Sequence, residues 1–204
     1  MKISPLETRT RVAIEAAALL YYSIEKDYKQ AKEKAAKNQG VSLLPSNREI
    51  ALELDQINEE IDGVNKKEQL IQMRIEALNI MNVLKDYSPI LIGSVWRGII
   101  RKGSDIDIAV YHDFPTEIPN ILDSNGLDVS KTQWVTVTKR GKTETSFHIY
   151  LTLGTHMVEI TVRSSEEVHM KRKCEVFGDE IKGLNPQELS RVLANNPARK
   201  FLPI

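Results

Sequence analysis

The apolar residues of the first 88 positions recur at helical spacing. From about Leu6 to Lys37 they fall three or four positions apart, which predicts one long helix. The Asn38–Gly40 stretch is a stop signal, and Ser46 with Glu49 forms a capping box that predicts the start of a second helix. The second helix is predicted to end at residues 62–63, and a third to span residues 66–87.

Beyond Ser88 the pattern changes to short runs in which apolar and polar residues alternate. Alternation with a period of two is typical of strands that bury one face. It predicts strands at residues 90–92, 105–111, 133–139, 145–153 and 156–163, with a hairpin turn at Arg140 and Gly141. Short helices are predicted at residues 116–122, 165–172 and 186–194.

Together these elements predict an α+β fold, with an N-terminal helical region packed on a mixed or antiparallel sheet. The length of 204 residues suits one domain, or a compact domain with a helical extension. The change of pattern predicts a helical region at residues 1–88 and a sheet domain with short C-terminal helices at residues 89–204.

Composition narrows the classes of function. Lys plus Arg equal Asp plus Glu at 28 each, which argues against a protein held on nucleic acid by its overall charge. Cys174 is the single cysteine, so the chain forms no internal disulfide and lacks the thiolates of a structural zinc site. The start of the chain has no signal-peptide pattern, and no apolar run reaches the ~20 residues of a membrane span. We therefore expect a cytoplasmic protein without a membrane partner.

Asp105 and Asp107 are the first candidates for chemistry. They lie two positions apart on a predicted strand, so their side chains point to the same face, while Ile106 and Ile108 point to the other. Two adjacent carboxylates repel each other and are costly to bury without a cation. A pair of hard oxygen ligands on a rigid strand suits Mg²⁺ or Mn²⁺.

A Gly-Ser dipeptide follows the preceding predicted strand. Gly93 allows the backbone to approach a ligand closely, and Ser94 adds a hydroxyl donor at the start of a turn. Arg97 can offer a planar pair of donors to phosphate oxygens. These residues predict a phosphate site beside the aspartate pair.

The combined pattern resembles the nucleotidyltransferase superfamily that includes DNA polymerase beta, the kanamycin nucleotidyltransferases and the CCA-adding enzymes. That family carries Gly-Ser, about ten residues, and then Asp-x-Asp on the next strand; here Gly93, Ser94 and the Ser104–Ile108 run fit this pattern. The resemblance covers residues 90–163. It is tightest to the minimal nucleotidyltransferases and to the catalytic core of archaeal-type CCA-adding enzymes.

The resemblance implies a third carboxylate on a later strand, and Glu159 is the only acid of the run at residues 156–163. It implies transfer of a nucleoside monophosphate from an NTP, with two Mg²⁺ or Mn²⁺ ions held by Asp105, Asp107 and Glu159. The implied nucleotide and phosphate ligands are Gly93, Ser94, Arg97 and Ser104. The family has aspartate more often than glutamate at the third position, and Glu159 is also a candidate general base.

Each of these residues has a simpler interpretation. The aspartates alternate with isoleucine as on any half-exposed strand, and Glu159 could be a solvated strand residue. His148, His156, Trp96 and Tyr150 are interpreted as packing or surface residues before any functional role. Without the Gly-Ser dipeptide at the right spacing, the simpler interpretation of Asp105 and Asp107 would be preferred.

The sequence leaves the acceptor open. The predicted partners are an NTP, with ATP the expected donor, and an acceptor that is a small molecule, an RNA or a partner protein. The N-terminal helices could cover the sheet, close over the nucleotide, or form a homodimer. The alternative function is a non-catalytic nucleotide-sensing or RNA-binding module with the same fold.

Overall fold

The structure is a computed structural model that describes residues 4–139 and 142–203. The turn predicted at Arg140 and Gly141 lies outside the described residues. The described chain divides into two compact units: the first comprises residues up to Lys66 with 173–180 and 203, and the second comprises residues 67–172 and 181–202. The predicted boundary between a helical region and a sheet domain at residue 88 remains a prediction.

Three helical segments form the first unit: α1 (Pro5–Tyr21), α2 (Tyr28–Asn38) and the first part of α3 (Asn47–Val83). Ser4 caps α1 in a capping box with Glu7. The core of this unit is rich in alanine, which lets the helices approach one another closely; its alanines are Ala13, Ala16, Ala17, Ala31, Ala35 and Ala36.

The prediction of one helix from Leu6 to Lys37 is wrong, because α1 and α2 are separated at residues 22–27. Ser23 adopts the left-handed conformation, with φ at 57°, which an α-helix cannot continue through. Asp27 then caps α2, its Oδ1 accepting a hydrogen bond of 2.9 Å from the backbone N–H of Gln30. The apolar spacing runs across both helices, and the break comes from local cap chemistry.

The capping box of Ser46 and Glu49 at the start of α3 is confirmed. The helix end predicted at residues 62–63 appears as a kink, since Asp62 has a non-helical backbone (φ −144°, ψ 28°). The helix resumes directly after Asp62, earlier than the predicted restart at residue 66. It ends at Val83 and is followed by a 3₁₀ turn, η1 (Lys85–Tyr87).

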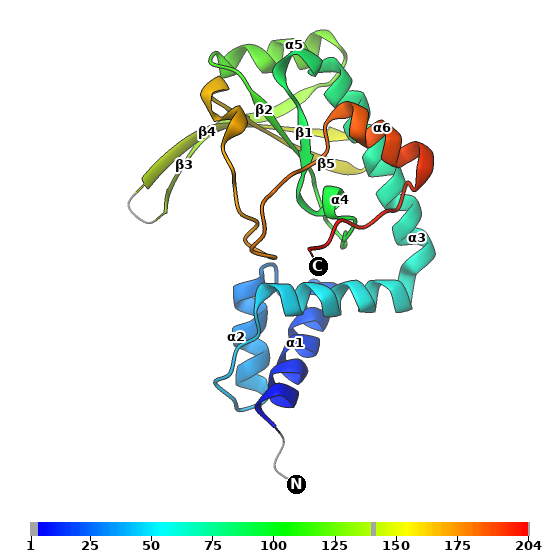
Figure 1. Cartoon of the computed structure of the whole chain (residues 1–204), viewed down its shortest axis with the longest axis vertical. Helices are drawn as coiled ribbons and strands as arrows, with labels where there is room; N and C mark the ends of the chain where they lie inside the picture. Colours follow the sequence, from blue (N-terminus) through cyan, green and yellow to red (C-terminus); the bar gives the residue numbers. More distant parts are fainter. Residues whose placement is uncertain (1–3, 140–141, 204) are drawn as a thin grey trace. The chain divides into compact units, whose positions relative to one another are not determined.

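A five-stranded mixed sheet forms the second unit, in the order β1-β2-β5-β4-β3 (Figure 1). Only β2 and β5 pair in parallel; the other three neighbouring pairs are antiparallel. The predicted α+β class with a mixed sheet is confirmed. The strands are β1 (Ile90–Ile92), β2 (Ile106–Tyr111), β3 (Val129–Lys139), β4 (Lys142–Leu153) and β5 (His156–Arg163).

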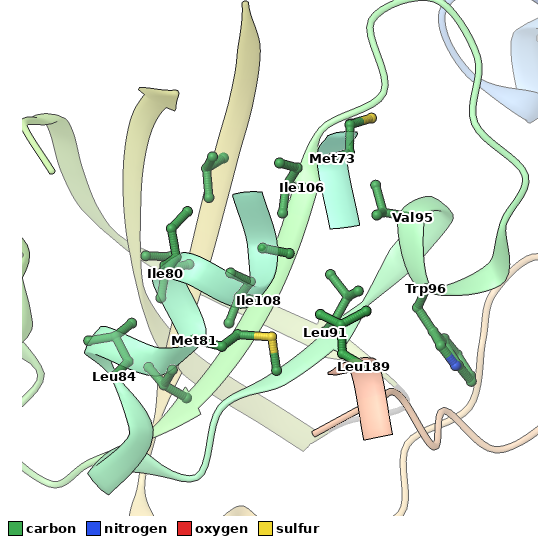
Figure 2. Close-up of a cluster of buried hydrophobic side chains, with 14 of the residues drawn as sticks. Met73, Ile80, Met81, Leu84, Leu91, Val95, Trp96, Ile106, Ile108 and Leu189 are labelled. Carbon is green, nitrogen blue, oxygen red and sulfur yellow. The ribbon is translucent and has the colours of Figure 1, made fainter. Parts of the chain in front are cut away.

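Helices cover one face of this sheet. The second part of α3, together with α4 (Gly93–Arg97) and α6 (Pro186–Asn195), packs on Leu91, Ile106 and Ile108, and Figure 2 shows these side chains meeting in one apolar cluster. Ile106 and Ile108 are buried, as the alternation on β2 predicts. The polar residues of the same strands therefore lie on the other face of the sheet.

Short helices complete the second unit: η2 (Pro115–Glu117), α5 (Ile118–Ser124), η3 (Ser165–His169) and α6. The predicted helix at residues 165–172 is a 3₁₀ helix that ends at His169. Asn185 caps α6 and Pro186 is its first residue, as predicted. Within the described part of the chain, no helix combines the length and apolar character needed to cross a bilayer.

Candidate functional site

Asp107 and Glu159 lie side by side on the face of the sheet opposite the helices. The parallel pairing of β2 with β5 places Asp107 opposite Glu159, and the antiparallel pairing with β1 places Ile92 opposite Asp107. Both acids are half-buried. The sheet topology thus brings together two of the three predicted carboxylates from distant parts of the sequence.

Gly93 begins α4, and because it has no side chain the Asp107 carboxylate can lie directly against its backbone. A Cβ atom at position 93 would lie 1.9 Å from Oδ2 of Asp107, and the backbone of Gly93 has φ at 70°. Both the collision and the left-handed conformation require glycine here. Gly93 of the Gly-Ser dipeptide and Asp107 of the Asp-x-Asp pair are therefore in direct contact.

Asp105 lies just before β2 and is exposed. The turn that leads to it is closed by Ser104, whose Oγ accepts a hydrogen bond of 2.9 Å from the backbone N–H of Arg101. Gly103 in this turn has φ at 77°. Ser104, predicted as a phosphate ligand, here shapes the loop that presents Asp105.

Burial and neighbouring carboxylates raise the pKa of both aspartates. Burial, and after it the charges of Glu159 and Asp105, together raise the pKa of Asp107 to about 7. The pKa of Asp105 is also raised, first by burial and then by Glu159, while Arg101 lowers it. The site is consequently short of positive charge, and a cation would relieve the repulsion.

A set of polar side chains on β3 and β4 surrounds Glu159, and the sequence analysis did not assign them to the site. His148 Nδ1 lies 2.5 Å from Oε1 of Glu159, and the Tyr150 hydroxyl donates to the same oxygen at 3.0 Å. Gln133 Nε2 donates to the Tyr150 hydroxyl at 2.9 Å, and Ser146 Oγ lies 2.8 Å from His148 Nε2.

The signal for these residues was present in the sequence. His148 and Tyr150 alternate with the buried residues Phe147, Ile149 and Leu151, so they lie on the face of β4 that carries the acids. What the sequence could not supply was the pairing of β4 with β5, which places Tyr150 directly opposite Glu159.

Ser94 and Arg97 have different surroundings. Ser94 is half-buried in α4, and its carbonyl accepts from the backbone N–H groups of Gly98 and Ile99. Arg97 is only 5% exposed; its Nη1 donates to the carbonyl of Phe201 at 2.9 Å, and its guanidinium lies 4.1 Å from the centre of the Trp96 ring. These contacts assign Arg97 to the packing of the C-terminal segment, and its role as a phosphate ligand stays a prediction.

Arg74 of α3 binds the backbone of α4 through hydrogen bonds, a role that the sequence did not predict. It is fully buried, and it donates to the carbonyls of Val95 and Trp96 at 3.1 and 3.0 Å. It also donates to the carbonyls of Pro197 and Arg199 at 2.6 and 2.9 Å. Arg74 thus fixes both the helix that begins at Gly93 and the C-terminal segment.

His156, at the start of β5, belongs to a separate pair. Its Nδ1 lies 2.7 Å from Oε2 of Glu76, a residue of α3 whose other carboxylate oxygen accepts from Gln72. Both side chains of the pair are almost fully buried. His156 therefore ties α3 to the sheet, in agreement with its interpretation as a packing residue.

Within the described ranges, no group of three or more His, Cys, Asp or Glu side chains is arranged so that it could already hold a metal ion. Asp105, Asp107 and Glu159 are neighbours whose charges influence one another, but they do not form a preformed cage. The donor set is nevertheless of the right kind, because carboxylate oxygens with little compensating charge are the ligands that Mg²⁺ and Mn²⁺ prefer. These residues therefore fit a divalent cation by chemistry and charge.

Comparisons with known proteins identify the family and distant structural neighbours. A family described as "Domain of unknown function (DUF4269)" matches residues 73–181, just over half of the chain. A comparison with curated proteins gave no match.

Two solved structures are similar to part of this chain. One is described as "Structural Plasticity of Cid1 Provides a Basis for its RNA Terminal Uridylyl Transferase Activity" (17% identity, TM-score 0.35) and covers 50% of this chain and 32% of that one. The other is described as "structure of GLD-2/RNP-8 complex" (12% identity, TM-score 0.33) and covers 51% of this chain and 34% of that one. This chain thus matches about a third of the length of each, and at these TM-scores neither likeness carries an inference about activity.

Proposed function

This chain belongs to the family described as "Domain of unknown function (DUF4269)", and we propose that it is a metal-dependent nucleotidyltransferase. The observation that carries the proposal is the contact of the Asp107 carboxylate with Gly93, beside Glu159 on the neighbouring strand. The Gly-Ser and Asp-x-Asp elements that resemble the nucleotidyltransferase superfamily are thus adjacent in space as well as correctly spaced in sequence.

In the proposed reaction Asp105, Asp107 and Glu159 would hold divalent cations, of which the expected species is Mg²⁺ or Mn²⁺. When bound, the cations supply charge neutralisation on the triphosphate and a lower pKa for the attacking hydroxyl. Asp107 and Glu159 are held in place by the pairing of β2 with β5. Glu159 can also accept the proton of the acceptor hydroxyl.

Gly93 and Ser94 form the other wall of the proposed site. Because Gly93 has no side chain, the Asp107 carboxylate lies directly against its backbone, beside the position proposed for the triphosphate. The hydroxyl of Ser94 is the proposed donor to a phosphate oxygen. The bond that forms joins the acceptor oxygen to the α-phosphorus, and the bond that breaks releases pyrophosphate.

Binding of the donor nucleotide tests the proposal first. Isothermal titration of the chain with each of the four NTPs in the presence of Mg²⁺ should show binding of at least one, with ATP the expected donor. An α-labelled NTP should then transfer its label to an RNA, protein or small-molecule acceptor, or to water as a slow side reaction.

The Asp107→Asn variant separates the proposed enzyme from its alternatives. We expect transfer to fall by about 10³-fold or more, as when a group that stabilises transition-state charge is lost. Asp86→Asn, at an exposed acid of the same unit, is the matched control and should retain full activity. NTP binding without any transfer would indicate a nucleotide-sensing module, and no NTP binding would reject the proposal.

A further inference from the structure

Two chains of hydrogen bonds converge on a single oxygen of Glu159. One runs from Ser146 through His148, and the other from Gln133 through Tyr150, and both end at Oε1. All four side chains come from β4, which is next to β5 in the sheet, and from β3, which is next to β4. Such a network is more than strand pairing requires, since backbone hydrogen bonds already join these strands.

The direction of each bond follows from the chemistry of the acceptor. A carboxylate has no proton to give, so both His148 Nδ1 and the Tyr150 hydroxyl donate to Oε1. A carboxylate oxygen has two lone pairs, and these two donors match that number. Oε2 of Glu159 is therefore the oxygen that remains for a ligand or an acceptor proton.

Ser146 determines which nitrogen of His148 carries the proton. Ser146 is buried, and its hydroxyl can donate to Nε2 at 2.8 Å, which leaves the neutral ring with its proton on Nδ1. The side chain of His148 is itself only 15% exposed, so water competes poorly for either nitrogen. The ring is thus fixed in the state that donates to Glu159.

We propose that His148 and Tyr150 are positioning residues that hold Glu159 so that Oε2 faces the substrate. This inference rests on the proposed function, in which Glu159 holds a cation or accepts a proton. The longer glutamate has one more rotatable bond than the aspartate more usual in nucleotidyltransferases, and two hydrogen bonds to one oxygen remove that freedom. Aspartate at position 159 would withdraw the carboxylate from both donors.

The hydrogen bonds of His148 can be tested by a measurement that does not depend on enzyme activity. Long-range ¹H–¹⁵N correlation spectra of His148 in the full chain should show Nδ1 protonated. In Ser146→Ala the Nδ1–H form should lose population to the Nε2–H form. An unprotonated Nδ1 in the wild-type chain would overturn the proposal, because His148 could not then donate to Glu159.

Substitutions at the two donors test the positioning role. We expect His148→Ala and Tyr150→Phe each to lower kcat by about 10–100-fold, the usual cost of removing a residue that orients a metal ligand, with KM for the NTP changed by less than about threefold. His148→Asn should recover most of this loss, because its amide nitrogen occupies the place of Nδ1. His169→Ala and Tyr22→Phe, at exposed positions, are the matched controls and should leave kcat unchanged.

Cation affinity distinguishes failure of this inference from failure of the proposed function. Titration of Mn²⁺ followed by electron paramagnetic resonance should show about 10–100-fold weaker binding in His148→Ala and Tyr150→Phe than in the wild type. Loss of affinity in a chain with no transferase activity would reject the proposed function and retain the positioning role. Unchanged Mn²⁺ affinity together with unchanged kcat would overturn the positioning role.

Discussion

Two buried charges in the second unit are treated in opposite ways. Arg74 is fully buried, but four backbone carbonyls accept its hydrogen bonds. Asp107 is half-buried beside Glu159 and Asp105, and every cause that acts on its pKa raises it. Hydrogen bonds within the fold compensate the first charge, although burial lowers the pKa of Arg74 to about 10, whereas like charges surround the second.

The difference distinguishes a charge with a structural role from one whose role, in the proposed function, is to bind a ligand. A buried charge with a full set of hydrogen-bond partners contributes to stability and specifies one arrangement. A carboxylate kept among like charges costs stability, and such a cost is typical of a site that waits for a ligand. Arg74 and Asp107 are therefore expected to respond to neutralisation in opposite directions.

Neutralisation of Arg74 should have the largest effect. Arg74→Met keeps the length of the side chain but leaves four carbonyls of α4 and the C-terminal segment without their donor. We expect the free energy of unfolding to fall by about 3–5 kcal/mol, measured by urea denaturation. Arg191→Met, at an exposed arginine of α6, is the control and should change it by less than about 0.5 kcal/mol. An equal loss in both variants would contradict the structural role of Arg74.

Neutralisation of Asp107 should stabilise the chain at neutral pH. The folded state raises the pKa of Asp107 from 3.8 to about 7, so between these values the folded chain keeps a proton that the unfolded chain has released. The stability contributed by this group is therefore full at low pH and is lost as the pH rises toward 7. In the absence of divalent cations we expect Asp107→Asn to raise the free energy of unfolding at pH 8 by about 2 kcal/mol, roughly half of what the full shift would give, because the side chain is partly screened by solvent.

The pH dependence provides the internal control for this prediction. At pH 4 the aspartate is protonated in the folded state and resembles asparagine, so the difference between the two chains should shrink. Lower stability of Asp107→Asn at pH 8 would show that the ionised carboxylate is compensated after all.

A divalent cation should remove the same penalty without mutation. We expect Mg²⁺ at ten times its dissociation constant to raise the free energy of unfolding of the wild-type chain by about 1.4 kcal/mol. The increase should be much smaller in Asp107→Asn, and sodium chloride at equal ionic strength should not reproduce it. Equal stabilisation of both chains would place the cation elsewhere.

A pair of glycines tests the contact at Asp107 with the smallest effect on stability. Gly93→Ala and Gly103→Ala both place a side chain at positive φ, which costs about 1 kcal/mol each. Only at Gly93 would the new Cβ meet Asp107; at Gly103 nothing lies within 4 Å. Turning of the carboxylate relieves the contacts with Oδ2 and Cγ but not the one with Cβ of Asp107 at 3.1 Å, so we expect a somewhat larger loss of stability in Gly93→Ala and a loss of transfer activity in that variant alone. Full activity in both would remove Gly93 from the site.

Local patterns in the sequence predicted the local structure well. The strands β1 and β5 and the start of α6 lie where alternation and capping place them. The break between α1 and α2 was missed because the left-handed Ser23 and the cap at Asp27 interrupt an apolar pattern that itself continues. Periodicity reports which face is buried, and it does not report where a backbone turns.

Only those parts of the site that consist of residues close together in the sequence could be predicted. Gly93 and Asp107 meet as their spacing implied, but the partners of Glu159 on β3 and β4 depend on strand pairing, which hydrophobic periodicity does not encode. The contacts of Arg97 were not predictable for a similar reason, since its partner Phe201 is distant in sequence, and its role as a phosphate ligand stays a prediction. The metal and nucleotide roles of Asp105, Asp107, Glu159, Ser94 and Ser104 stay predictions.

The parallel pairing of β2 with β5 also has a consequence for how the protein matures. Asp107 leaves the ribosome 52 residues before Glu159, and the two meet only when these strands pair. Strands so distant in sequence pair slowly during folding, and repulsion between the two carboxylates opposes this pairing. A nascent chain without β5 therefore lacks Glu159 beside Asp107, and the proposed cation site forms only when these two strands pair.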